Sequence, residues 1–138
     1  MRNAIHRFTD SHLITFGRFS LFLVYFWFGL LKIINVSPAG PLVESLFTRT
    51  ISFMSFGTFY VLFSLFEMLI GILFLFKKTQ RAALALFLFH MITTIMPLFF
   101  LTSMTWQNMF VPTLEGQYII KNIVLLALAL IVVSDRRK

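Results

Sequence analysis

The sequence contains no cysteine. Disulfide bonds, thiolate metal sites, iron–sulfur clusters and nucleophilic cysteine chemistry are therefore excluded for this chain on its own. Charged side chains are also scarce, at 12% of the residues, against roughly 25% in an average soluble domain. The net charge of +7 does not indicate nucleic-acid binding, because the basic residues stand at the ends of long apolar runs. A soluble enzyme, a secreted domain and a nucleic-acid-binding protein are thus excluded.

Apolar residues make up 59% of the 138 residues, and the mean hydropathy is +0.89. A helix needs about 20 mostly apolar residues to cross a bilayer, and four segments qualify, at about 16–34, 57–76, 82–101 and 118–133. The fourth is short for a span unless its ends extend or the bilayer thins. The sequence therefore predicts an all-α fold, an integral membrane four-helix bundle in a single domain over residues 1–138.

The distribution of Lys and Arg predicts the orientation of this bundle. Nine of the twelve basic residues flank one end of the predicted spans, and basic residues prefer the cytoplasmic side. An even number of spans then places both the N-terminus and the C-terminus in the cytoplasm, and we expect a multi-pass protein of a bacterial inner (plasma) membrane. The nine residues are Arg2, Arg7, Arg18, Lys77, Lys78, Arg81, Arg136, Arg137 and Lys138.

Two longer connections are expected on the opposite side. The first holds Pro38 and Pro41 and then an apolar stretch around Phe47. It is interpreted either as a short amphipathic helix at the membrane interface or as an ordered loop over the bundle. The second, over residues 102–117, contains Trp106, which is typical of the aromatic belt at a membrane interface.

One face of the first predicted helix carries its polar residues, since Arg18, Tyr25, Gly29 and Lys32 follow one another at helical spacing. Gly29 would allow a neighbouring helix to approach closely. Arg18, Tyr25 and Lys32 are candidate ligand-binding residues, with Arg18 and Lys32 near opposite membrane surfaces. In the alternative interpretation, the two cations simply extend along the helix toward the surface.

Glu67 and His90 are the candidate catalytic pair. Glu67 precedes Thr79 by 12 residues and His90 follows it by 11, so two antiparallel helices joined at Thr79 bring the pair to the same depth. A charged carboxylate at the centre of a span costs roughly 2.5–3.5 kcal/mol on insertion scales, so Glu67 needs a partner. The pair is interpreted as a proton relay, as an anchor for a ligand, or as a hydrogen bond that sets helix register.

A second polar group is expected at the start of the fourth helix. Glu115, Lys121 and Asn122 lie there, at the level predicted for Lys32, and they are candidate ligand-binding residues. The group is interpreted either as a salt-bridge network that closes the bundle or as the entry to a site for an anion or a quinone headgroup.

Several short motifs resemble those of the DoxX-like membrane proteins, and especially of their YkgB-type inner-membrane branch. The resemblance rests on Arg18, on the run Tyr25-Phe26-Trp27-Phe28-Gly29-Leu30-Leu31-Lys32, on Glu67-Met68-Leu69-Ile70-Gly71, and on Glu115-Gly116-Gln117-Tyr118 with Lys121-Asn122. It covers nearly the whole chain and implies a four-helix membrane bundle. It also implies a link to thiosulfate:quinone oxidoreductase subunits or to oxidative-stress resistance, but it assigns no residue a role.

Three functional hypotheses follow. The first is a subunit of a quinone-linked redox system, with quinone as the cofactor and a redox protein as partner; the chain has no redox group of its own. The second is a non-catalytic accessory protein of a larger complex. The third is a small proton-coupled transporter, which would need a homo-oligomer to enclose a pore. The bilayer is a partner in all three, and neither a metal site nor nucleic acid is expected. Whether the chain is an enzyme stays open.

Overall fold

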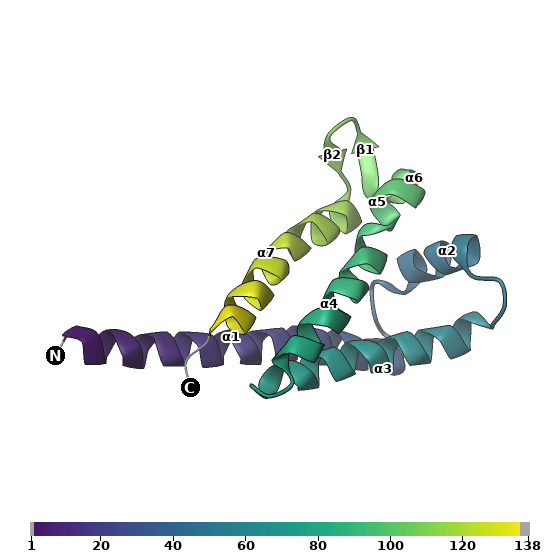
Figure 1. The fold of residues 1–138 in the computed structure, drawn as a ribbon. Helices are drawn as coiled ribbons and strands as arrows, with labels where there is room; N and C mark the ends of the chain where they lie inside the picture. The colour runs from purple at the N-terminus through teal and green to yellow at the C-terminus, as the bar shows by residue number, and fades with distance from the viewer. Residues whose placement is uncertain (1, 136–138) are drawn as a thin grey trace.

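The computed structural model describes residues 2–135, with side chains from residue 11 onward, and is built almost entirely of helices (Figure 1). The elements are, in order, α1 (Arg2–Ile33), α2 (Gly40–Thr50), α3 (Phe56–Leu75), α4 (Gln80–Ile95), α5 (Pro97–Phe100), α6 (Thr102–Thr105), β1 (Trp106–Asn108), β2 (Val111–Pro112) and α7 (Leu114–Ser134).

Four of the described helical segments are long and apolar enough to cross a membrane: Ser11–Ile33, Phe56–Leu75, Gln80–Phe100 and Leu114–Ser134. This confirms the all-α class and the four apolar helices. The ends of the fourth segment extend, which is one of the two alternatives left open by the sequence: the N-cap Thr113 starts α7 earlier than its apolar pattern does, and its 21 residues extend about 31 Å. Likewise α1 begins well before residue 16.

The third span is interrupted at Pro97. Helix α4 ends at Ile95, Met96 follows, and α5 begins at Pro97, since a proline nitrogen has no hydrogen to continue the ladder of backbone bonds. The Met96 N–H still donates to the Ile92 carbonyl at 3.2 Å. The span therefore continues in a changed direction and does not end there.

Helices α1 and α3 lie side by side and antiparallel (Figure 1), and two glycines permit the close approach. A Cβ on Gly29 would stand 2.8 Å from the Ser64 carbonyl oxygen. A Cβ on Gly71, at the other end of the contact, would stand 3.0 Å from the Phe26 backbone nitrogen. Small residues are the usual means by which membrane helices pack backbone against backbone.

Helices α4 and α7 complete the bundle. A tight turn joins α3 to α4, held by the Thr79 hydroxyl, which donates to the Leu73 carbonyl at 2.7 Å. Helix α7 packs against α1 and α4, and a Cβ on Gly17 of α1 would meet Val132 at 3.0 Å. The buried core lies where the four helices meet and is almost wholly apolar: Leu21, Tyr25, Ile70, Phe74, Ala83, Phe87, Met91, Ala129 and Val132.

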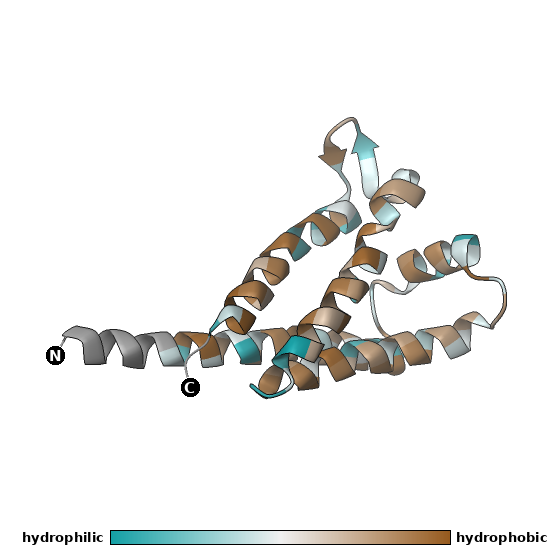
Figure 2. Cartoon of the chain, in the orientation of Figure 1, coloured by the Kyte–Doolittle hydropathy of each residue, from teal (hydrophilic) through white to brown (hydrophobic). Residues whose placement is uncertain are grey.

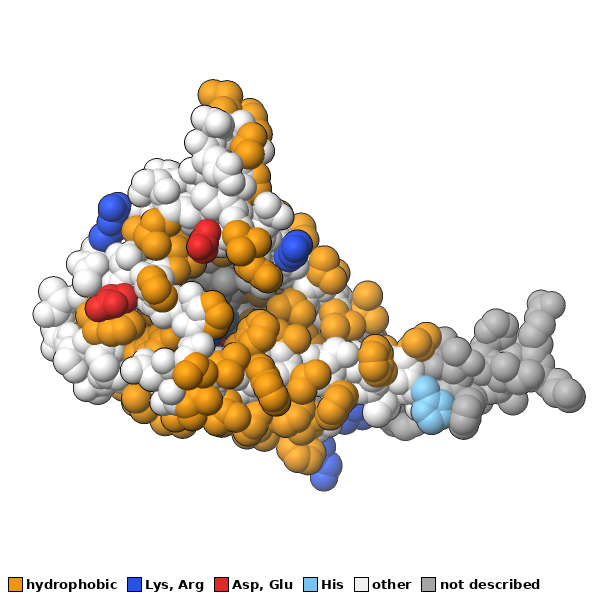
Figure 3. All heavy atoms as spheres, turned by 180° about the vertical axis from the view of Figure 1, so that it is seen from behind, with side chains coloured by type: hydrophobic (Ala, Val, Ile, Leu, Met, Phe, Trp, Pro, Cys, Tyr) orange, Lys and Arg blue, Asp and Glu red, His pale blue; other side chains and the backbone are white. Residues whose placement is uncertain are grey.

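Apolar side chains also cover the outside of these helices, as the brown ribbons of Figure 2 and the orange surface of Figure 3 show. Phe16, Trp27, Phe89 and Ile123 are all more than half exposed. Large apolar patches of this extent need an apolar environment. The surface of the bundle is thus suited to lipid.

The first connection forms a helix, so of the two interpretations the helical one agrees with the structure. Pro41 stands in the first turn of α2, where proline is well tolerated. Phe47 is buried and its ring lies 4.9 Å from that of Phe59 on α3. Arg49 donates to the Phe100 carbonyl at 2.6 Å, which ties α2 to the end of the third span.

Candidate functional site

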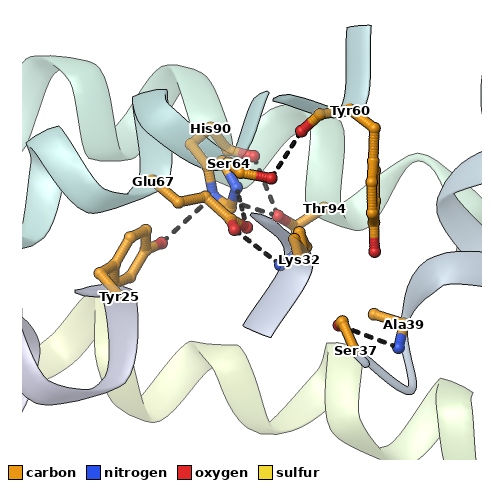
Figure 4. Close-up of polar contacts among 9 residues, drawn as sticks. All are labelled: Tyr25, Lys32, Ser37, Ala39, Tyr60, Ser64, Glu67, His90 and Thr94. Atoms are coloured by element: carbon orange, nitrogen blue, oxygen red, sulfur yellow. Dashed lines mark hydrogen bonds and ion pairs between the residues drawn. The ribbon is translucent and has the colours of Figure 1, made fainter. Parts of the chain in front are cut away.

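Three helices each contribute one ionisable side chain to a single buried cluster (Figure 4). Lys32 of α1 donates to Glu67 of α3, with Nζ 2.6 Å from Oε2. His90 of α4 lies on the other side of the same carboxylate, with Nε2 3.0 Å from Oε1. The structure therefore brings the candidate pair Glu67 and His90 into direct contact, and it adds Lys32 to them.

The second ring nitrogen of His90 also has polar neighbours. Its Nδ1 lies 3.3 Å from the Tyr25 hydroxyl and 3.3 Å from the Thr94 hydroxyl. With Lys32 beside it, Glu67 is a carboxylate and only accepts hydrogen bonds, so His90 Nε2 donates. In the neutral ring, Nδ1 then accepts from Tyr25 or Thr94. A continuous hydrogen-bonded chain runs from Tyr25 through His90 and Glu67 to Lys32.

Burial makes this pairing necessary. Lys32, Glu67 and His90 are each only 6% exposed, and a charge removed from water needs a counter-charge or hydrogen bonds. The surroundings are aromatic: the Phe63 ring stacks on His90 with centroids 5.1 Å apart, and the Lys32 ammonium lies 5.9 Å from the centroid of that ring. The low polarity around the cluster strengthens each electrostatic contact within it.

The structure pairs Lys32 with Glu67, whereas the sequence placed it only at the same level as Glu115, Lys121 and Asn122. Glu115 and Lys121 are exposed on α7, and the Lys121 ammonium lies 5.4 Å from the Tyr118 ring centroid. Lys32 instead turns toward Glu67, because a buried ammonium gains more from a buried carboxylate than from groups that water already solvates.

Arg18 has a partner that the sequence did not indicate. Its Nη2 donates to Gln80 Oε1 at 3.0 Å, and Gln80, the first residue of α4, is only 7% exposed. The Arg18 Nε is buried without a hydrogen-bond partner. This contact lies near the α3–α4 turn, apart from the Glu67 cluster, so the ligand-binding candidates fall into three separate places.

The cluster has the parts of a proton-transfer path but no arrangement suited to a metal ion. Within residues 11–135, no three His, Asp or Glu side chains are grouped so that they could hold one. His90 bonds through both nitrogens, and an imidazole can take a proton at one nitrogen while releasing another from the second. The hydrogen bonds from Tyr25 to Lys32 therefore join the two ends of the cluster without a break.

Replacing Tyr25 by phenylalanine is expected to cost about 1 kcal/mol of stability, the net value of one hydrogen bond. The change removes the hydroxyl at His90 Nδ1 and keeps the ring, which packs on Phe87 at 5.4 Å between centroids. Unfolding by SDS titration in mixed micelles measures the difference. Tyr118→Phe, at a position 62% exposed, is the matched control and should change nothing. Equal losses in both variants would contradict the structure.

Comparison of the chain with family models, with curated proteins and with solved structures gave no match.

Proposed function

We propose that the chain is a multi-pass protein of a bacterial inner membrane, with both termini in the cytoplasm, and a DoxX-like subunit of a quinone-linked redox or oxidative-stress-related system. Four helices of spanning length and the gathering of basic residues at one end of them support the membrane placement. The resemblance of the motifs around Lys32, Glu67 and Lys121 supports the link to quinone chemistry.

The observation that carries the proposal is the hydrogen-bonded chain of Tyr25, His90, Glu67 and Lys32 inside the bundle. Ionisable side chains within a membrane span indicate a functional site by default. Reduction of a quinone consumes protons together with electrons, so a protein that serves it needs protonatable groups at membrane depth. The electrons must come from a bound partner, because the chain offers no redox group.

Extraction in mild detergent, followed by mass spectrometry of lipids and proteins, tests the proposal. The wild type should retain quinone, or a redox protein, in a fixed ratio to the chain. Lys32→Met and Glu67→Gln should lose most of it while remaining monodisperse. Glu44→Gln is the control, since Glu44 is an exposed carboxylate on α2. Bulk lipid alone in the wild-type preparation would contradict the redox-subunit proposal.

A second candidate, a non-catalytic accessory protein, is favoured by one observation. Among the described residues, Arg18 Nε is the one buried side-chain polar atom without a hydrogen-bond partner, so the Glu67 cluster is satisfied internally. A network of this kind can serve to set helix register alone. If the chain is an accessory protein, Glu67→Gln should lower its stability and reduce the amount of any co-purifying partner to the same degree. If the cluster is a functional site, Glu67→Gln should reduce the amount of the partner while the protein stays folded.

A further inference from the structure

The β-hairpin between α6 and α7 has a firmly held base. The Trp106 indole N–H donates to the Leu98 carbonyl at 3.0 Å, and the Thr113 hydroxyl donates to the Met104 carbonyl at 2.7 Å. Gly116 lets the start of α7 approach the end of α6 and the hairpin closely, because a Cβ there would stand 2.1 Å from the Thr105 carbonyl oxygen and 3.0 Å from Pro112 Cβ. These contacts hold the hairpin at a set angle to the bundle.

The tip of the hairpin is apolar and uncovered, in contrast to its base. Met109 and Phe110 are each 86% exposed, the highest values among the large apolar residues of the structure. Phe110 also adopts a φ of 61°, in the left-handed region that glycine and asparagine normally occupy in tight turns. A bulky residue there works against stability. The stability of the fold therefore does not explain why a phenylalanine occupies position 110.

The segment that carries the tip has no ionisable side chain of its own; the nearest charges come from Arg49, at the Phe100 carbonyl, and from Glu115. The chain has no ionisable side chain between His90 and Glu115, a stretch that includes the end of the third span, the hairpin and the start of α7. Phe99, Phe100 and Leu114 at the same end are 74%, 53% and 61% exposed. Figure 3 shows the apolar tip at the top of the molecule, above the charged side chains. The exposed polar side chains next to the tip, Gln107 and Asn108, are uncharged.

We infer that Met109 and Phe110 insert into the interfacial layer of the bilayer, as an apolar wedge beside the ends of α5 and α7. The inference rests on the proposed membrane placement. A protein partner or a second copy would be recognised through a polar rim around the apolar centre, whereas the polar side chains beside this tip, Gln107 and Asn108, lie on one strand alone. Lipid needs no such rim, and aromatic residues are enriched at the depth where spans end.

The absence of cysteine makes a direct depth measurement simple. Met109→Cys and Phe110→Cys variants, each spin-labelled in phospholipid vesicles, report their collision rates with oxygen, which concentrates in lipid, and with a nickel chelate, which stays in water. Ile123→Cys, on the outer face of α7 and 68% exposed, is the reference for lipid. Lys77→Cys, exposed in the α3–α4 turn, is the reference for water.

The labels at positions 109 and 110 should show an oxygen-to-nickel ratio several-fold above that of Lys77→Cys and below that of Ile123→Cys, which lies near the middle of α7. A ratio equal to that of Lys77→Cys would overturn the inference while leaving the membrane placement intact. Protection from both reagents would also overturn it, in favour of a protein contact. A water-like ratio at position 123 would instead overturn the membrane placement. If the labels at positions 109 and 110 give similar ratios, distortion of the turn by either label does not account for the result.

Discussion

Replacing Glu67 by alanine is expected to lower the free energy of unfolding by about 3–5 kcal/mol, the usual cost of removing one partner of a buried ion pair. Lys32 and His90 both depend on this carboxylate, at 2.6 Å and 3.0 Å. Without it the Lys32 ammonium, only 6% exposed, has a charge with no counter-charge. Reversible unfolding by SDS titration in micelles, followed by circular dichroism, measures the loss.

Two further variants separate the effect of the lost Glu67 charge from the effect of the lost side-chain volume. Glu44→Ala removes an exposed carboxylate and should change stability by less than about 0.5 kcal/mol. The double variant Lys32→Met with Glu67→Gln removes both charges and keeps most of the volume. It should recover much of the loss, because buried ion pairs can often be replaced by uncharged groups at little cost. A double variant less stable than Glu67→Ala would show that the ion pair itself is not the source of the effect.

Gly29→Ala is expected to destabilise the bundle by about 1–3 kcal/mol, the range for overpacking a tight contact. The added methyl would lie 2.7 Å from Met68 Cγ and 2.8 Å from the Ser64 carbonyl oxygen. The Met68 side chain can move, but the α3 backbone can yield only if the two helices separate. Helix propensity alone would predict the opposite effect, because alanine is more favourable than glycine in a helix by about 1 kcal/mol.

Gly57→Ala provides the matched control for that change. Gly57 lies in the first turn of α3, and a Cβ there would meet nothing within 4 Å. The same substitution should therefore be neutral or slightly stabilising in the same SDS titration. If both glycine variants changed stability by equal amounts, the close approach of α1 and α3 would not be the reason for Gly29.

The shared depth of Glu67 and His90 was predictable because the turn between their helices is short. With only a few residues between α3 and α4, counting outward from Thr79 sets which residues share a depth, and the two side chains meet at 3.0 Å. The partner of Lys32 was not predictable in this way. The long connection that contains α2 separates α1 from α3, so register between them comes from packing at Gly29 and Gly71.

The hairpin had no signal in the sequence for a related reason. Two-residue turns usually contain glycine or asparagine at positions with positive φ, whereas here Phe110 takes that conformation. The turn is held by the tertiary hydrogen bonds of Trp106 and Thr113 and not by the conformational preferences of the turn residues. Similarly, the true start of α7 depends on the Thr113 cap, whose hydroxyl accepts from the Gly116 N–H, and not on the apolar pattern.

The pairing of Lys32 with Glu67 also has a consequence for biogenesis. The two residues are 35 positions apart, and at synthesis rates of about 5–20 residues per second the ammonium waits for its carboxylate for about 2–7 s. His90 follows 23 positions later. During that interval Lys32, at the end of its helix, must reach toward the membrane surface. If the spans insert in order, α1 can settle to its final depth only after α3, which carries Glu67, has entered the membrane.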